Sequence, residues 1–77
     1  MIIRGGMFYI IFDMENGYVL RAAGELEPGA KFCVYKSSLR HWEPPHEKEP
    51  LTQEQIAAII KEAESMNGEG RVGIRFE

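Results

Sequence analysis

The chain has 77 residues, 44% hydrophobic and 27% charged, which suits a single folded domain over residues 1–77 and excludes a disordered tail. Its formal net charge is −3, and the acidity falls in residues 43–77, which carry eight Asp or Glu against four Lys or Arg. The clustered basic face of nucleic-acid-binding proteins is missing. An acidic surface suits a basic protein partner, or merely keeps a small protein soluble.

Cysteine content and hydropathy bear on the compartment. Cys33 is the only cysteine, so the chain has no internal disulfide and needs no oxidising environment. The longest apolar run, Met7 to Phe12, is six residues, too short to span a membrane, and the start lacks the pattern of a signal peptide. We therefore expect a cytoplasmic protein that is neither secreted nor inserted in a membrane.

The first predicted element is a hairpin. Residues 7–13 alternate so that Phe8, Ile10 and Phe12 share one face, which is typical of a half-buried strand, and Asn16-Gly17 precedes a returning strand over residues 18–24. A two-residue turn would place Phe12 opposite a charged residue. A three-residue loop, 15–17, with Gly17 in the left-handed conformation of a bulge, instead pairs Phe12 with Leu20 and Ile10 with Ala22. We predict the second register.

The remaining elements follow from turn and capping signals. A turn at residues 27–29 introduces a third strand over about 30–35, after which Leu39 and Trp42 fold back against the core. A capping box of Thr52 and Gln55 begins a helix, and the Asn67-Gly68 pair ends it. The apolar face of this helix is formed by Ile56, Ile59, Ile60 and Ala63. A closing strand is predicted by the alternation of Val72, Ile74 and Phe76. The prediction is an α+β fold: a small, mainly antiparallel sheet with one helix packed on one face.

A proline-stiffened acidic loop, Trp42 to Pro50, is the most distinctive segment. Pro44 and Pro45 remove two backbone donors and fix two φ angles, so the segment is an ordered surface loop outside any helix or central strand. Trp42 has two interpretations: a buried anchor of the loop, or a partly exposed contact residue of the kind common in binding sites. One ring can serve both purposes.

The candidate catalytic residues do not support an enzymatic function. Cys33 lies between Phe32 and Val34, with no neighbour that would lower its pKa, so we expect a buried, unreactive thiol. His41 and His46 flank the acidic loop, but their spacing matches no established zinc pattern. We predict no metal, no cofactor and no enzymatic activity.

The segments Phe32-Cys33-Val34-Tyr35-Lys36-Ser37-Ser38 and Trp42-Glu43-Pro44-Pro45-His46-Glu47 carry a resemblance. The chain resembles small immunity proteins of bacterial polymorphic toxin systems, in particular the immunity protein 74 family. The resemblance implies a non-catalytic protein that binds a toxin domain delivered by neighbouring cells and blocks its active site or a nearby surface.

On this basis we expect a cytoplasmic binding protein whose partner is another protein. An acidic inhibitor would suit a basic toxin such as a nuclease, since complementary charge speeds encounter. The alternative is a small adaptor or regulatory subunit. The candidate contact residues are those of the loop and two exposed acids of the helix: Trp42, Glu43, Pro44, Pro45, His46, Glu47, Glu49, Glu54 and Glu62.

Overall fold

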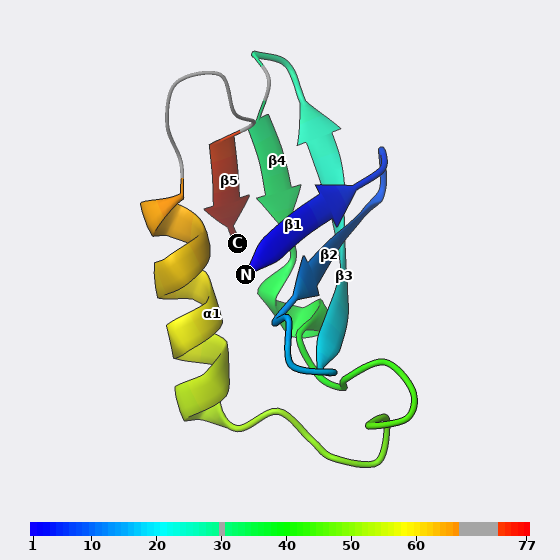
Figure 1. The fold of residues 1–77 in the computed structure, drawn as a ribbon. Coiled ribbons are helices and arrows are strands. Elements are labelled where there is room, and N and C mark those ends of the chain that lie inside the picture. Colours follow the sequence, from blue (N-terminus) through cyan, green and yellow to red (C-terminus); the bar gives the residue numbers. More distant parts are fainter. Residues whose placement is uncertain (30, 67–72) are drawn as a thin grey trace.

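A computed structural model describes residues 1–29, 31–66 and 73–77. These described residues form a five-stranded sheet with the strands in the order β1-β2-β3-β4-β5, one α-helix and one short 3₁₀ helix (Figure 1). The elements are β1 (Ile2–Gly5), β2 (Tyr9–Asp13), β3 (Val19–Glu27), β4 (Lys31–Val34), η1 (Lys36–Ser38), α1 (Gln53–Ser65) and β5 (Gly73–Phe76). The predicted α+β class, with a single helix on a mainly antiparallel sheet, is confirmed.

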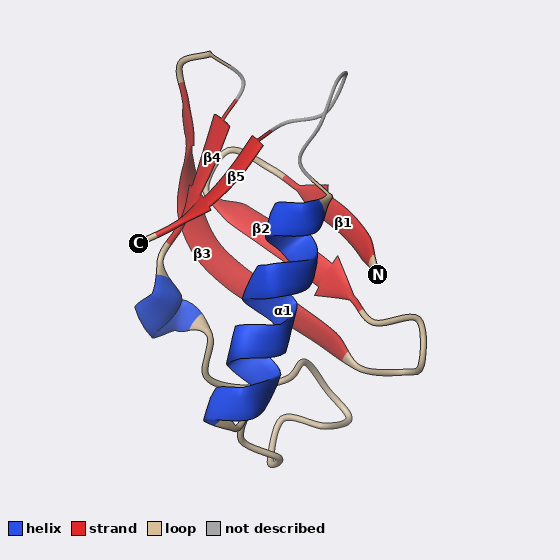
Figure 2. Cartoon of the chain, turned by 90° about the vertical axis from the view of Figure 1, so that its left-hand side faces the viewer, coloured by secondary structure: helices blue, strands red, loops and turns tan. Residues whose placement is uncertain are grey.

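The long strand β3 divides the sheet into two halves. Its residues 19–23 pair antiparallel with β2, and its residues 24–27 pair antiparallel with β4 on the other side. β5 is parallel to β4, because the chain crosses through α1 before it returns. The sheet is therefore curled, and α1 lies across one of its faces (Figure 2).

The core lies between that face and the helix. Alternate strand residues point inward, and α1 contributes Ile59 and Ala63, both at most 5% exposed. The other buried members of this cluster come from the strands and from the segment after β4: Ile10, Phe12, Leu20, Ala22, Phe32, Val34, Leu39, Trp42 and Ile74. The predicted burial of Leu39 and Trp42 against the core is confirmed.

The hairpin between β2 and β3 has the predicted register, with Phe12 opposite Leu20 and Ile10 opposite Ala22. Gly17 has a φ of 95°, as the three-residue loop requires. Glu15 also has a positive φ, 65°, which the sequence did not indicate. Its backbone N–H donates to Asp13 Oδ1 at 2.8 Å, and this local bond offsets part of the cost of the left-handed conformation.

The helix begins as predicted. The Thr52 hydroxyl accepts from the Gln55 N–H at 3.1 Å, and the Gln55 side chain accepts from the Thr52 N–H at 2.9 Å. These reciprocal bonds satisfy two of the donors that a helix N-terminus leaves free. The predicted stop at Asn67-Gly68 lies outside the described residues.

The N-terminus is where the sequence prediction was wrong. Residues 2–5 form β1, an unpredicted strand, and Phe8 belongs to the turn between β1 and β2 instead of a strand. The Gly6 N–H donates to the Tyr9 carbonyl at 3.0 Å and closes this turn. Phe8, expected on the core face, is therefore 69% exposed.

Other boundaries moved by a few residues. The returning strand β3 extends to Glu27, beyond the predicted residue 24, because its last residues pair with β4. The third strand ends at Val34, where the predicted range ran to residue 35, and the chain then turns into η1. Ala30 and Val72, expected in strands, lie outside the described residues.

Candidate partner-binding site

The loop formed by residues 42–50 is fastened to the sheet at both ends. Trp42 forms an isolated bridge with Leu20 of β3, and the Glu43 N–H donates to the Val19 carbonyl at 2.7 Å. The other end is held by a bridge between His41 and Pro50. Backbone bonds at the two ends make this segment a closed loop with a defined position on the domain.

Two consecutive turns shape the inside of the loop. The His46 N–H donates to the Glu43 carbonyl, and the Glu49 N–H donates to the His46 carbonyl, both at 3.0 Å. Pro44 and Pro45, joined by a cis peptide bond, are exposed at the first turn. The prediction of an ordered surface loop is confirmed.

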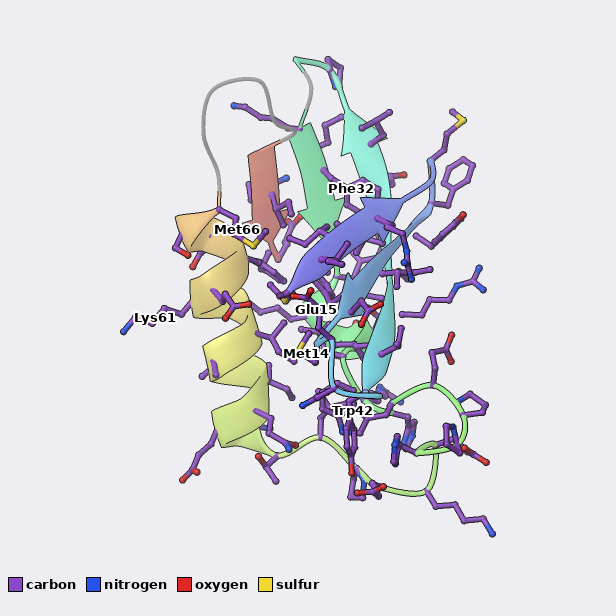
Figure 3. All side chains as sticks on the ribbon, in the orientation of Figure 1. Met14, Glu15, Phe32, Trp42, Lys61 and Met66 are labelled. Atoms are coloured by element: carbon purple, nitrogen blue, oxygen red, sulfur yellow. The ribbon has the colours of Figure 1, made fainter. Side chains whose placement is uncertain are left out.

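Tyr18, the residue before β3, holds the loop from the side of the sheet. Its ring stacks on His46, with centroids 3.7 Å apart and an interplanar angle of 11°, and meets the Trp42 ring edge-on at 5.1 Å. Trp42 is only 6% exposed and lies at the lower end of the sheet (Figure 3). The structure therefore supports the interpretation of Trp42 as a core anchor of the loop.

Glu49 completes this cluster from the far end of the loop. The Tyr18 hydroxyl donates to Glu49 Oε1 at 3.0 Å, and His46 Nδ1 lies 2.7 Å from Glu49 Oε2. An ionised carboxylate only accepts hydrogen bonds, so the imidazole nitrogen is the donor in this contact. We call Tyr18, Trp42, His46 and Glu49 the aromatic clamp.

The clamp fixes the charge of Glu49. The hydrogen bond from His46, followed by the one from Tyr18, lowers the pKa of the Glu49 carboxyl below its ordinary value of 4.5. The same carboxylate raises the pKa of the Tyr18 hydroxyl above 10.0. At neutral pH the loop thus presents a carboxylate that is held in place by a neutral phenol and an imidazole N–H.

The other acidic residues of the loop face a different direction. Glu43 and Glu47 line a shallow groove on the outer side of the sheet, together with Arg40 and His41. Glu47 is exposed and makes no hydrogen bond or ion pair with the part of the chain that the structure describes. Its charge is therefore available to a partner.

The two candidate acids of the helix differ from each other. Glu54 is exposed in the first turn of α1. Glu62 lies two turns further on, with Oε2 at 3.6 Å from the amino group of Met1, which also contacts Glu15 Oε2 at 3.1 Å. Glu62 and Trp42 line one shallow groove between α1 and the β2–β3 loop. The predicted contact residues thus occupy three neighbouring parts of the surface and do not form one compact patch.

Tyr18 is the residue that sequence reasoning missed. Its contacts with Trp42, His46 and Glu49 join positions at least 24 residues apart in the chain, so no local pattern reveals them. The only available signal was an aromatic residue directly after the Asn16-Gly17 turn.

Cys33 is buried, as predicted, at 2% exposed. Its Sγ donates to Glu77 Oε2 at 3.2 Å, and burial, with this hydrogen bond, raises the pKa of the thiol above its ordinary value. A raised pKa keeps the sulfur protonated and poorly nucleophilic. Across residues 1–29, 31–66 and 73–77, no three His, Cys, Asp or Glu side chains are grouped so as to hold a metal ion. No helix in the same ranges has the length and apolar character needed to cross a membrane.

The fold and the loop together define a small α+β domain that presents a fastened acidic loop beside one helix. The sequence model of the family described as immunity protein 74 matches residues 2–77, so the chain belongs to this family. The resemblance seen in the Trp-x-Pro-Pro loop is confirmed, and with it an immunity function in general. No curated protein and no solved structure matches the chain significantly.

Proposed function

We propose that this protein is a cytoplasmic, non-catalytic inhibitor that binds and neutralises a cognate toxin domain of a bacterial polymorphic toxin system. The observation that carries the proposal is the family match over residues 2–77. The fastened loop, the buried and protonated Cys33 and the wholly apolar described core are all compatible with a binding role.

The loop of residues 42–50 is the proposed centre of the toxin contact. Its ends are tied to β3 and to one another, and the aromatic clamp holds its interior, so little conformational freedom remains to be lost on binding. A pre-ordered loop retains more of its contact energy as affinity than a flexible one does. Pro44, Pro45 and Glu47 are its exposed members.

Charge is the second argument for this surface. The loop and the neighbouring helix carry five acidic residues, and none of them is buried among the described residues. These residues are Glu43, Glu47, Glu49, Glu54 and Glu62. Such a surface complements a basic toxin domain, for example a nuclease with a basic substrate groove, and would speed the encounter of the two proteins. The effect should weaken as salt is added.

The test begins with the reading frame next to this gene. Its product is expressed under tight control in a bacterial host, alone and together with the present chain. We expect growth arrest by the neighbouring product alone, restored growth on co-expression, and a purified complex of the two proteins. A neighbouring product that is harmless, or that arrests growth despite co-expression and does not bind the chain, would reject the proposal.

Charge reversal then tests the surface. Glu47→Lys reverses an exposed charge that makes no hydrogen bond or ion pair with a described residue, so it should leave stability within about 0.5 kcal/mol of the wild type. Glu64→Lys, at an exposed position of α1 outside the candidate set, is the matched control with the same change in net charge. We expect Glu47→Lys to slow association several-fold more than Glu64→Lys does. Equal association rates for the two variants would place the interface elsewhere.

A further inference from the structure

A cleft of about 500 Å³ opens inside the curled sheet, beyond the C-terminal end of α1. At least one residue from each of the five strands lines it, and Met66 closes it on the helix side. Ile3, Met7, Leu26 and Phe32 supply much of its apolar wall. The volume lies within the ~300–1,000 Å³ of typical ligand pockets, so the cleft is large enough for side chains of a bound segment.

The rim of the cleft exposes large apolar side chains. Met7 is 65% exposed and Leu26 is 51% exposed. The Leu26 N–H donates to the Met7 carbonyl at 3.0 Å, so the two residues are neighbours on one surface. Met66 adds a second flexible thioether at the opposite wall, and methionines adapt well to the shape of an apolar partner. Contiguous exposed apolar surface of this kind typically marks an interaction site.

The free edge of β1 adjoins the cleft, and its unpaired backbone groups favour the binding of an extended segment. Gly6 and Tyr9 form a hydrogen-bonded pair at the end of the β1–β2 ladder. Such pairs alternate along an antiparallel ladder, so Arg4 and Ile2 also bond toward β2. The N–H and C=O groups of Ile3 and Gly5 therefore point away from β2. No strand of residues 1–29, 31–66 and 73–77 pairs with this edge.

Arg4 supplies the electrostatic complement. Among the described residues that line the cleft, it is the only charged one, and its side chain is 57% exposed. Arg4 Nη2 lies 3.7 Å from Asp13 Oδ2, and the two side chains form a weak, solvent-exposed ion pair. A carboxylate of a partner can therefore bind this guanidinium, with the bidentate geometry that arginine favours.

We propose that the cleft binds an extended segment of the partner toxin, which adds a strand to the free edge of β1. The segment inserts an apolar side chain between Met7, Leu26 and Phe32 and places an acidic side chain on Arg4. Successive residues of a strand face opposite sides, so the apolar and acidic residues are adjacent in its sequence. This inference rests on the proposed function for the identity of the partner.

The cleft and the loop of residues 42–50 lie toward opposite ends of β3. Trp42 pairs with Leu20 near one end of that strand, and Leu26 lies six residues further along. At ~3.3 Å per residue the separation is roughly 20 Å, which an interface of ordinary size spans. One toxin domain can therefore contact both surfaces.

The test does not require the toxin. A phage-displayed library of random twelve-residue peptides is panned on the immobilised wild-type protein, and the selected peptides are measured by fluorescence polarisation. We expect the peptides to share an apolar residue next to Asp or Glu. Leu26→Asp and Met7→Asp, both at exposed rim positions, should weaken binding about tenfold or more. Circular dichroism confirms that each variant is folded.

Two comparisons sharpen the result. Tyr35→Asp changes an exposed aromatic residue outside the cleft lining and should leave the affinity within about twofold. In Arg4→Gln the affinity should fall, and replacing the acidic residue of the peptide should then cause no further loss. Failure to select any peptide, or peptides that bind Leu26→Asp as tightly as the wild type, would overturn the proposal.

The same variants separate this inference from the proposed function. If co-expressed wild type protects cells from the neighbouring toxin and Leu26→Asp does not, the cleft is part of the toxin interface. If both protect equally and bind the toxin with the same affinity, the cleft proposal is wrong while the immunity function stands. If the wild type itself gives no protection, the immunity proposal fails, and the peptide selection still decides whether the cleft binds extended segments.

Discussion

Replacing Trp42 with alanine should destabilise the whole domain. The indole is 6% exposed, contacts the Tyr18 ring edge-on, and belongs to a backbone bridge with Leu20. Truncating a buried Trp to Ala typically costs ~3–5 kcal/mol, through lost burial and the cavity left behind. A 77-residue domain has a total stability of ~4–12 kcal/mol, so the variant should retain only a fraction of it.

The loss of stability is measured by urea unfolding monitored with far-UV circular dichroism. Tryptophan fluorescence cannot be used for this variant, because Trp42 is the only tryptophan of the chain. With a urea m-value of about 1 kcal/mol/M for so small a domain, the midpoint should fall by about 3 M or more. Phe8→Ala is the control: Phe8 is 69% exposed, so its removal should change stability by less than about 0.5 kcal/mol. A loss below about 1 kcal/mol for Trp42→Ala would refute the anchor role and return the ring to the list of direct contact residues.

Three further predictions concern the backbone, the thiol and pH. Gly17→Ala should cost about 1 kcal/mol, because a Cβ there meets only open space but φ is 95°. Gly24→Ala should cost distinctly more, since its Cβ would overlap the Cys33 carbonyl oxygen and lie 2.6 Å from Phe32 Cε1; similar urea midpoints for the two variants would contradict this ranking. The Cys33 thiol, buried and with a raised pKa, should react with a thiol reagent far more slowly in the native protein than in urea, and equal rates would exclude its burial. Because the folded-state pKa of Glu49 is lowered, its stabilising contribution is present above about pH 4.5 and disappears as pH falls through that lowered value. Below about pH 5, the free energy of unfolding should therefore fall more steeply with decreasing pH in the wild type than in Glu49→Gln. Parallel pH dependences for the two proteins would show that Glu49 does not stabilise the clamp.

Local chemistry explains the predictions that the structure confirmed. The helix start depends on Thr52 and Gln55, three residues apart, and the hairpin register depends on matching Phe12 with Leu20 across a short loop. Both arrangements are decided by neighbours in the chain, so capping rules and face matching were sufficient. The Trp-x-Pro-Pro loop likewise indicated its own order, because two prolines restrict the backbone wherever they occur.

Long-range packing decided the rest. Ile2 and Ile3 are followed by Arg4 and two glycines, and this apolar pattern is too short to predict a strand. β1 forms because its backbone pairs with the edge of β2. Phe8 is exposed for the same reason: once β1 forms, Phe8 becomes part of the turn that joins the two strands.

The aromatic clamp and the apolar cleft also required the tertiary structure. Tyr18 meets His46 and Glu49 only after the loop is fastened to β3, and the cleft forms only because β3 pairs with different strands along its two halves. The sequence by itself determined the composition of the acidic loop, the helix and the hairpin, since these depend on contacts between near neighbours. Which surfaces the loop and the sheet present to a partner was decided by contacts between distant residues, whose geometry no local pattern contains.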